Sequence, residues 1–108
     1  PHILPNFRGM MSTIYCDLKD EVKKNKIINL YKKFDKDNYF IKFLNDDERL
    51  DFFSVQKTNY CKIKVFNHSS DSKLIIVCNI DNLIKGASGQ AVQCFNLMEN
   101  YEENKALN

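Results

Sequence analysis

The order of apolar and polar residues along the chain predicts a sheet. Apolar and polar side chains alternate over residues 12–18 and 60–66, a period typical of strands with one buried face. The continuous apolar run over 74–80 indicates a central strand, joined to 60–66 by a polar hairpin loop. Residues 39–44 add a strand rich in aromatic and β-branched side chains. We therefore expect roughly four or five strands, mostly antiparallel.

A first helix is expected ahead of the strand at 39–44. Ile27, Leu30, Tyr31 and Phe34 recur at the spacing of one helix face. We expect Asn25 to be the N-cap, because a side-chain oxygen there accepts a hydrogen bond from the first turn.

A second helix is expected within residues 81–100, which follow the central strand. Ala91, Phe95 and Met98 fall on one stripe, with Val92 beside it. We expect this stripe to rest on the sheet, so that both helices cover one face in an α+β fold.

Two glycines, Gly86 and Gly89, stand where this second helix should begin. Each glycine inside a helix costs about 1 kcal/mol relative to alanine. Their presence predicts that a backbone or a ligand comes close, although they would also permit simple close packing. The sequence around them has neither the G-x-x-x-x-G-K-[ST] nor the G-x-G-x-x-G spacing of phosphate-binding loops.

The strand at 39–44 carries large side chains on both faces. On one face are Tyr39, Ile41 and Phe43, and on the other are Phe40 and Leu44. Such a surface in a small domain predicts a sheet-to-sheet or subunit interface. We therefore expect a homo-oligomer that forms through the sheet face.

Composition narrows the classes of function. The chain of 108 residues has a net charge of +2, which gives no support for a nucleic-acid or membrane partner. Its length fits one domain over 1–108, with a frayed polar tail at 101–108. The four cysteines lack C-x-x-C spacing and are expected to be buried, reduced thiols, and no metal site is expected. Because the chain begins with Pro1, we expect it to belong to a longer gene product.

Three segments resemble the N-acetyl-gamma-glutamyl-phosphate reductase family. Residues 81–98, DNLIKGASGQAVQCFNLM, are similar to the family's D-N-L-x-K-G-A-[AS]-G-Q-A-[VI]-Q followed by N-L-M. Residues 1–15 resemble P-H-L-x-P-M-x-R-G-[IL]-x-[SA]-T-x-Y, and 58–61, TNYC, resemble a further recurring segment. The departures are Asn6, where the family usually has methionine, and Cys94, where it commonly has asparagine.

The resemblance implies an activity. Members of the family use NADPH to reduce N-acetyl-gamma-glutamyl phosphate to N-acetylglutamate semialdehyde in cytoplasmic arginine synthesis. They combine a Rossmann nucleotide half with an α+β half related to the C-terminal domain of glyceraldehyde-3-phosphate dehydrogenases, which makes the oligomer contacts. This chain matches only the later part of the α+β half. The motifs of the family's catalytic cysteine and histidine are absent, so no catalytic residue is assigned and the chain alone is expected to be inactive.

The resemblance also implies site residues. The N-terminal end of the last helix lies near the nicotinamide in this superfamily, so Gly86, Ala87, Gly89 and Gln90 are the expected cofactor-side residues. Arg8 is expected to help hold the substrate carboxylate or phosphate, because arginine binds such groups bidentately. Two alternatives are an aspartate-type semialdehyde dehydrogenase and a stand-alone oligomerisation module without catalysis.

Overall fold

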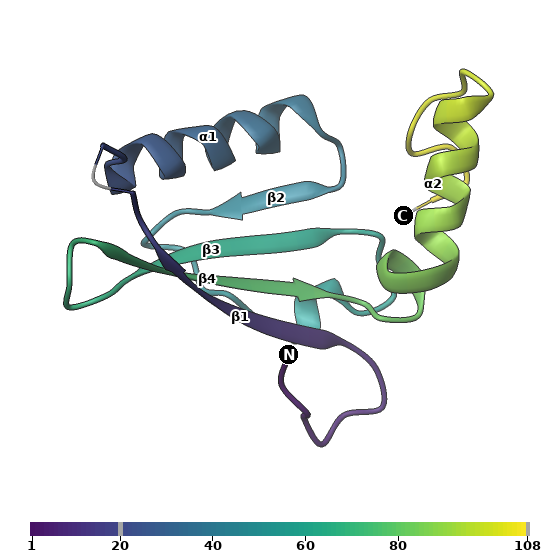
Figure 1. Ribbon diagram of the computed structural model, residues 1–108. Helices are drawn as coiled ribbons and strands as arrows, with labels where there is room; N and C mark the ends of the chain where they lie inside the picture. The colour runs from purple at the N-terminus through teal and green to yellow at the C-terminus, as the bar shows by residue number, and fades with distance from the viewer. Residues whose placement is uncertain (20, 108) are drawn as a thin grey trace.

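The computed structural model describes residues 1–19 and 21–107 and contains a four-stranded mixed sheet (Figure 1). The strands are β1 (Met10–Asp17), β2 (Ile41–Leu44), β3 (Cys61–Asn67) and β4 (Lys73–Ile80), in the order β1-β4-β3-β2. β4 is antiparallel to both of its neighbours, whereas β2 is parallel to β3. A parallel neighbour needs a crossover rather than a hairpin, and the long connection from β2 to β3 supplies it. The predicted α+β class is confirmed.

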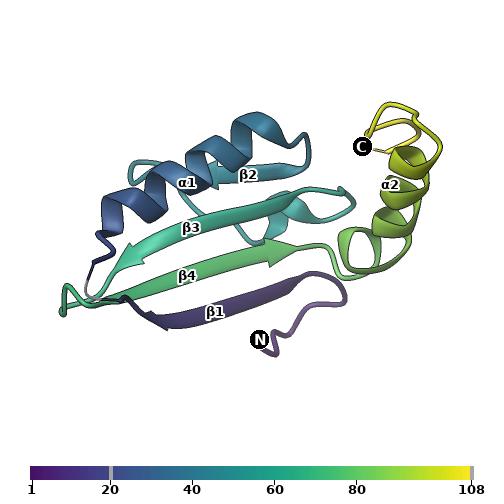
Figure 2. The same cartoon turned by 45° about the horizontal axis from the view of Figure 1, so that its top comes forward.

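Helix α1 (Lys24–Asp37) covers one face of the sheet (Figure 2). Buried under it is an apolar core made of Phe43, Val65, Leu74 and Ile76. Tyr31 of α1 stacks on Phe43, with ring centroids 5.9 Å apart. The predicted cap at Asn25 is wrong: the helix begins at Lys24, after an extended Lys23 that makes no side-chain cap. Asn25 therefore lies inside the first turn of α1 and not at its cap.

The opposite face is only partly covered by the chain itself. Lys62 on that face donates to Ser54 of the short helix η1 (Phe53–Val55), with 2.9 Å between Nζ and Oγ. Lys64 lies on the polar side of the alternating strand, yet it is buried, and its ammonium donates to the carbonyl oxygens of Asp46 and Glu48. The loop from β2 to η1 thus closes one part of this face.

The large side chains at 39–44 differ in how far they are available for the interface that the sequence predicts. Phe43 lies under α1 and is 7% exposed. Phe40 is 1% exposed, because it packs against the rings of Tyr39 and Tyr60 with centroids 4.9 and 5.6 Å away. Phe40 and Phe43 are therefore covered within the chain, whereas Tyr39 is 46% exposed. An interface through this strand stays a prediction.

The C-terminal helix lies beyond the strand ends rather than in the layer of α1 (Figures 1 and 2). It consists of the π-helical turn η2 (Ile84–Ser88) and α2 (Gly89–Met98). The expectation that both helices cover one face thus holds for α1 only. The predicted stripe points outward: Phe95 is 56% and Met98 78% exposed, whereas Gln93 and Asn96 are buried. Helical spacing identifies residues that share a side, but not which side is covered.

Candidate functional site

Three distant segments meet where β4 runs into η2: the N-terminal segment, the loop before β3 and the residues after β4. Arg8 pairs with Asp81, and the Gln56 amide donates to the Arg8 carbonyl oxygen at 2.8 Å. Asn59 donates to Gln93 of α2 at 2.9 Å. These are the segments that the sequence motifs single out. We call this cluster the motif junction, and it consists of Arg8, Gly9, residues 56–59 and residues 81–93.

Asp81 is the centre of the motif junction. Its carboxylate is fully buried and lies 2.8 Å (Oδ2 to Nε) and 3.1 Å (Oδ1 to Nη2) from Arg8. The backbone N–H of Lys57 donates to Oδ2 at 2.6 Å, and those of Leu83 and Ile84 donate to Oδ1 at 2.8 and 3.1 Å. Asp81 therefore satisfies the first N–H groups of the helical turn as a capping residue does, while also fastening two other segments.

The electrostatics of Asp81 follow from these contacts. Burial opposes ionisation and raises the pKa of its carboxyl. The hydrogen bonds from Arg8 and from the three backbone N–H groups outweigh burial and hold the pKa below its usual value. The carboxylate is therefore ionised at neutral pH and acts as a fixed anchor rather than as a proton donor.

The N-terminal segment is held at a second point by a glycine. The N–H of Gly9 donates to Asn82 Oδ1 at 2.7 Å. Gly9 has a φ of +107°, and a Cβ there would lie 2.6 Å from the ring of Phe52. Only glycine combines this backbone with this contact. The R-G pair of the N-terminal motif thus supplies one side chain and one backbone N–H to the same junction.

The two glycines at the helix start differ in what surrounds them. Gly89 is buried, and a Cβ there would collide with Asn59 Oδ1 and lie 2.5 Å from Ile84 Cγ2. Close packing within the chain therefore accounts for Gly89. Gly86 is exposed, and the nearest atom to a Cβ there is Ile80 Cδ1 at 3.4 Å, an ordinary contact. The chain's own packing places no such demand on Gly86.

A second polar network holds α2 to the rest of the chain. Oε1 of the buried Gln93 accepts from Asn59 and from Lys85 Nζ, the latter at 2.6 Å. Its amide donates to Glu103 Oε1 at 2.6 Å, and Asn96 donates to the carbonyl oxygens of Glu103 and Lys105. Burial lowers the pKa of Lys85. Through residue 107 the expected frayed tail is instead folded back against α2.

The remaining expected site residues lie on the surface of the junction. Ala87 and Gln90 are exposed like Gly86, and the Gln90 amide lies 3.3 Å from Cys94 Sγ. Arg8 is part-buried and already engaged with Asp81. A cavity of about 260 Å³ opens beside this surface. It is lined by Lys57, Asn59, Ile84, Ser88, Gly89, Val92, Ala106 and Leu107.

Asp81 and Asn82 are two central junction residues to which sequence reasoning gave no role. Their signal was present, because both follow the apolar strand directly and open the glycine-containing segment. Asp and Asn at such a position are typical helix-start residues. The sequence alone did not show their partners, because Arg8 and Gly9 each lie 73 residues away in the chain.

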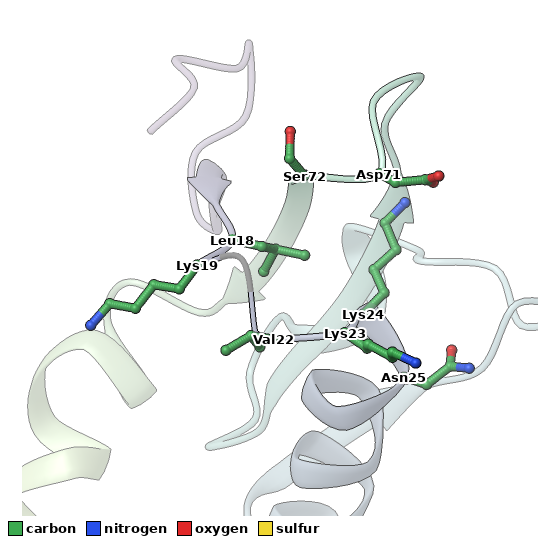
Figure 3. Close-up of a pocket in the computed structure, with 8 residues that line it drawn as sticks. All are labelled: Leu18, Lys19, Val22, Lys23, Lys24, Asn25, Asp71 and Ser72. Atoms are coloured by element: carbon green, nitrogen blue, oxygen red, sulfur yellow. The ribbon is translucent and has the colours of Figure 1, made fainter.

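Another cavity, of about 400 Å³, lies at the start of α1, at the opposite end of the sheet from α2 (Figures 1 and 3). It is lined by Leu18, Lys19, Val22, Lys23, Lys24, Asn25, Asp71 and Ser72. The Lys19 side chain extends away from the others (Figure 3). None of the expected site residues lines this cavity.

Comparison with known proteins places the chain. Residues 1–82 match the family model described as semialdehyde dehydrogenase, dimerisation domain. The chain belongs to this family. It is 43% identical over 107 residues to the N-acetyl-gamma-glutamyl-phosphate reductase of Thermoanaerobacter pseudethanolicus, which covers 99% of the chain and 31% of that protein. The reductase of Ehrlichia ruminantium is 47% identical, over 99% of the chain and 30% of that protein.

The fold agrees with the same family. The crystal structure of aspartate semialdehyde dehydrogenase II from Vibrio cholerae superposes with a TM-score of 0.68 at 18% identity, over 92% of this chain and 30% of that one. The resemblance inferred from the three sequence motifs is therefore confirmed. This chain spans about a third of the length of the curated relatives it matches.

Membrane-spanning helices and grouped metal ligands are two further features to consider. In the described residues 1–19 and 21–107, no helix is both long enough and apolar enough to cross a membrane. Within the same residues, no three histidine, cysteine, aspartate or glutamate side chains are grouped as metal ligands would be.

Proposed function

We propose that this chain is part of an NADPH-dependent reductase that converts N-acetyl-gamma-glutamyl phosphate to N-acetylglutamate 5-semialdehyde in cytoplasmic arginine biosynthesis. The observation that supports this function is the motif junction. The three segments that resemble the reductase family meet there, because Arg8 pairs with Asp81 and Asn59 bonds to Gln93, and curated relatives at 43% and 47% identity carry the reductase name. A dimerisation domain of a semialdehyde dehydrogenase supplies only part of such an enzyme, so the chain alone is inactive.

In this proposal the exposed surface of η2 and the start of α2 faces NADPH. Gly86, Ala87 and Gln90 form that surface, and Gly86 leaves open the space that a Cβ would take. The amide of Gln90 can donate to or accept from a carboxamide. Gly89 is buried below this surface and supports it indirectly, because the absence of a Cβ lets Asn59 and η2 pack closely.

Arg8 has a more limited role than free capture of an anion. Its Nε and Nη2 are committed to Asp81, and its side chain is 23% exposed. The proposed contact with the substrate carboxylate or phosphate therefore falls to Nη1. Asp81 would fix the plane of the guanidinium for that contact.

The outward stripe of α2 is the proposed contact with the nucleotide-binding half. Val92, Phe95 and Met98 are 37%, 56% and 78% exposed, an unusual amount of apolar surface for one short helix. The buried side of α2 is already occupied by polar contacts through Gln93 and Asn96. The stripe is therefore the side available to another domain.

The proposed homo-oligomer forms through the sheet face opposite α1. The strand register places Tyr15 of β1, Ile75 of β4 and Phe66 of β3 in one row across that face. Tyr15 is 74% and Phe66 40% exposed. A row of aromatic and β-branched side chains across three strands is suited to packing against a second sheet.

A chimeric enzyme tests the proposed function. The matching segment of the Thermoanaerobacter reductase is replaced by this chain, and acyl-phosphate-dependent oxidation of NADPH is measured. We expect activity with N-acetyl-gamma-glutamyl phosphate and much less with aspartyl phosphate. The matched control is the same replacement with the Ehrlichia segment, which is also about 30% of its parent.

The outcomes separate the alternatives. Preference of the chimera for aspartyl phosphate would assign an aspartate-type dehydrogenase. A chimera that folds but lacks activity, beside an active Ehrlichia control, would favour an oligomerisation module without catalysis. Reduction of acyl phosphate by this chain alone would contradict the assignment.

A further inference from the structure

Cys61 of β3 and Cys78 of β4 form a close pair of thiols. Their Sγ atoms are 3.3 Å apart, and both side chains are free and half-buried. In the antiparallel register Cys61 lies opposite Ile80 and Cys78 lies opposite Ile63, so the two cysteines are diagonal neighbours on one sheet face. A disulfide bond is about 2.05 Å long, so its formation requires the two sulfur atoms to move closer together than they lie here.

The two thiols differ in acidity. They share one hydrogen bond, which lowers the pKa of Cys78 by stabilising its thiolate. The same hydrogen bond, together with burial, raises the pKa of Cys61. Either sulfur can donate in this hydrogen bond, and the directions of the two pKa shifts favour Cys78 as the thiol that loses its proton first.

We propose that Cys61 and Cys78 are a redox-active dithiol that hydrogen peroxide oxidises to an intramolecular disulfide. The Cys78 thiolate attacks one peroxide oxygen, the O–O bond breaks, and the departing hydroxide takes a proton to become water. The sulfur of Cys61 then loses its proton and attacks the resulting Cys78 sulfenic acid. The S–O bond breaks, a second water leaves and the S–S bond forms. Two thiols lose two electrons, and one peroxide gains them.

The other two cysteines lack this arrangement. Cys94 is exposed on α2, where its sulfur contacts the Gln90 amide. Cys16 on β1 lies opposite Leu74 and packs against the core under α1. They provide internal controls with one exposed and one half-buried thiol. Exposure alone would favour oxidation of Cys94, whereas the proposal requires Cys61 and Cys78 to react as a pair.

The position of the pair links it to the motif junction. Cys61 follows Asn59, which holds α2 through Gln93, and Cys78 precedes Asp81 on β4. A disulfide would covalently join the two strands that present these anchors. This inference does not depend on the proposed reductase function, because the thiol chemistry needs no other part of the enzyme.

Peptide mapping tests the proposal. The reduced full chain is treated with one equivalent of hydrogen peroxide, free thiols are alkylated, and trypsin is added without a reductant. We expect the peptide 58–62 to be linked to 74–85, with Cys16 and Cys94 alkylated. Intact mass should fall by the mass of two hydrogen atoms and recover with dithiothreitol. The Cys94→Ser variant should form the same link.

Two single variants test the order of steps. Cys61→Ser should stop at a sulfenic acid on Cys78 that dimedone captures, whereas Cys78→Ser should leave Cys61 largely unlabelled. Far-UV circular dichroism of both variants confirms that they fold, and the wild-type peptide map stands by itself if either does not. A link that includes Cys94 or Cys16, or a folded wild type with Cys61 and Cys78 still alkylated after peroxide, would overturn the proposal. Equal dimedone labelling of the two variants would overturn Cys78 as the attacking thiol.

Discussion

The two ends of the sheet are held together by different interactions. Under α1, apolar side chains pack on the sheet, with Phe43 and Leu74 buried and Tyr31 stacked above them. At the motif junction, the buried groups are a carboxylate and amides, and several of their contacts join segments far apart in the sequence. The α1 end can accept many apolar sequences of similar volume, whereas the junction depends on individual atoms.

This difference explains why a recognisable motif can have a structural role. Asp81, Asn82 and Gly89 belong to the segment that resembles the reductase family, yet their contacts in this chain are internal. They hold η2 in a fixed position, and the exposed Gly86 and Gln90 are placed by them. A motif residue therefore need not touch a ligand to be needed for binding one.

The largest expected loss of stability comes from a substitution in the apolar core under α1. Phe43→Ala removes a ring that is 7% exposed, and a buried Phe→Ala change costs about 3–5 kcal/mol of unfolding free energy. Urea denaturation followed by circular dichroism measures the loss. Phe53→Ala is the matched control, because that ring is 60% exposed and should change stability little. Equal losses in the two variants would contradict the location of the core.

Asp81→Asn, at the motif junction, should lower the unfolding free energy by a comparable amount. The change leaves Arg8 beside a neutral group and weakens four hydrogen bonds, and removal of one partner of a buried ion pair costs about 3 kcal/mol or more. Urea denaturation again measures the loss. The exposed pair between Asp17 and Lys73 is the control, and Asp17→Asn should unfold as the wild type does. A stable Asp81→Asn protein would show that the junction is held by packing alone.

The stabilisation by Asp81 should also depend on pH. Because its pKa is lowered in the folded chain from 3.8, its contribution is complete above that value. It is lost as the pH falls below 3.8 and passes through the folded pKa. The difference in unfolding free energy between wild type and Asp81→Asn should therefore shrink as the pH falls from about 5 to about 2. A difference that stays constant would exclude ionised Asp81 as its source.

The sequence predicted the two ends unequally. Periodicity located β1, β3 and α1, because burial of an apolar stripe leaves a repeating signal, while composition and a continuous apolar run located β2 and β4. The same rule predicted that the stripe with Phe95 and Met98 packs on the sheet. In the structure this stripe faces outward, and Gln93 is on the buried side of the helix. The junction contacts between different segments had no periodic signal, since each depends on a partner at least 24 residues away, as in the bond from Lys57 to Asp81. Their segments were found only through the family resemblance.

Gly89→Ala tests how closely the segments of the motif junction pack against one another. Its Cβ would collide with Asn59 Oδ1 and lie 2.9 Å from the Ile84 carbonyl oxygen, which is backbone and cannot rotate away. Overpacking of this kind costs about 1–3 kcal/mol. A double variant with Asn59→Ala should recover part of the loss, because it removes one of the colliding atoms. If Gly89→Ala is neutral, then η2 and the loop before β3 are not packed as closely as described.

Gly86→Ala should have the smallest effect on stability, and unlike the other variants it should stabilise the chain. A Cβ there meets Ile80 Cδ1 at 3.4 Å, so no group has to move. Replacing a helical glycine with alanine then gains up to about 1 kcal/mol, mainly because the unfolded chain loses freedom. If this surface faces NADPH as proposed, the same variant in the chimeric reductase should raise KM for NADPH while it raises the urea midpoint of this chain. An increase in stability with an unchanged KM would leave Gly86 without a cofactor role, and the proposed nicotinamide surface would have to move away from η2.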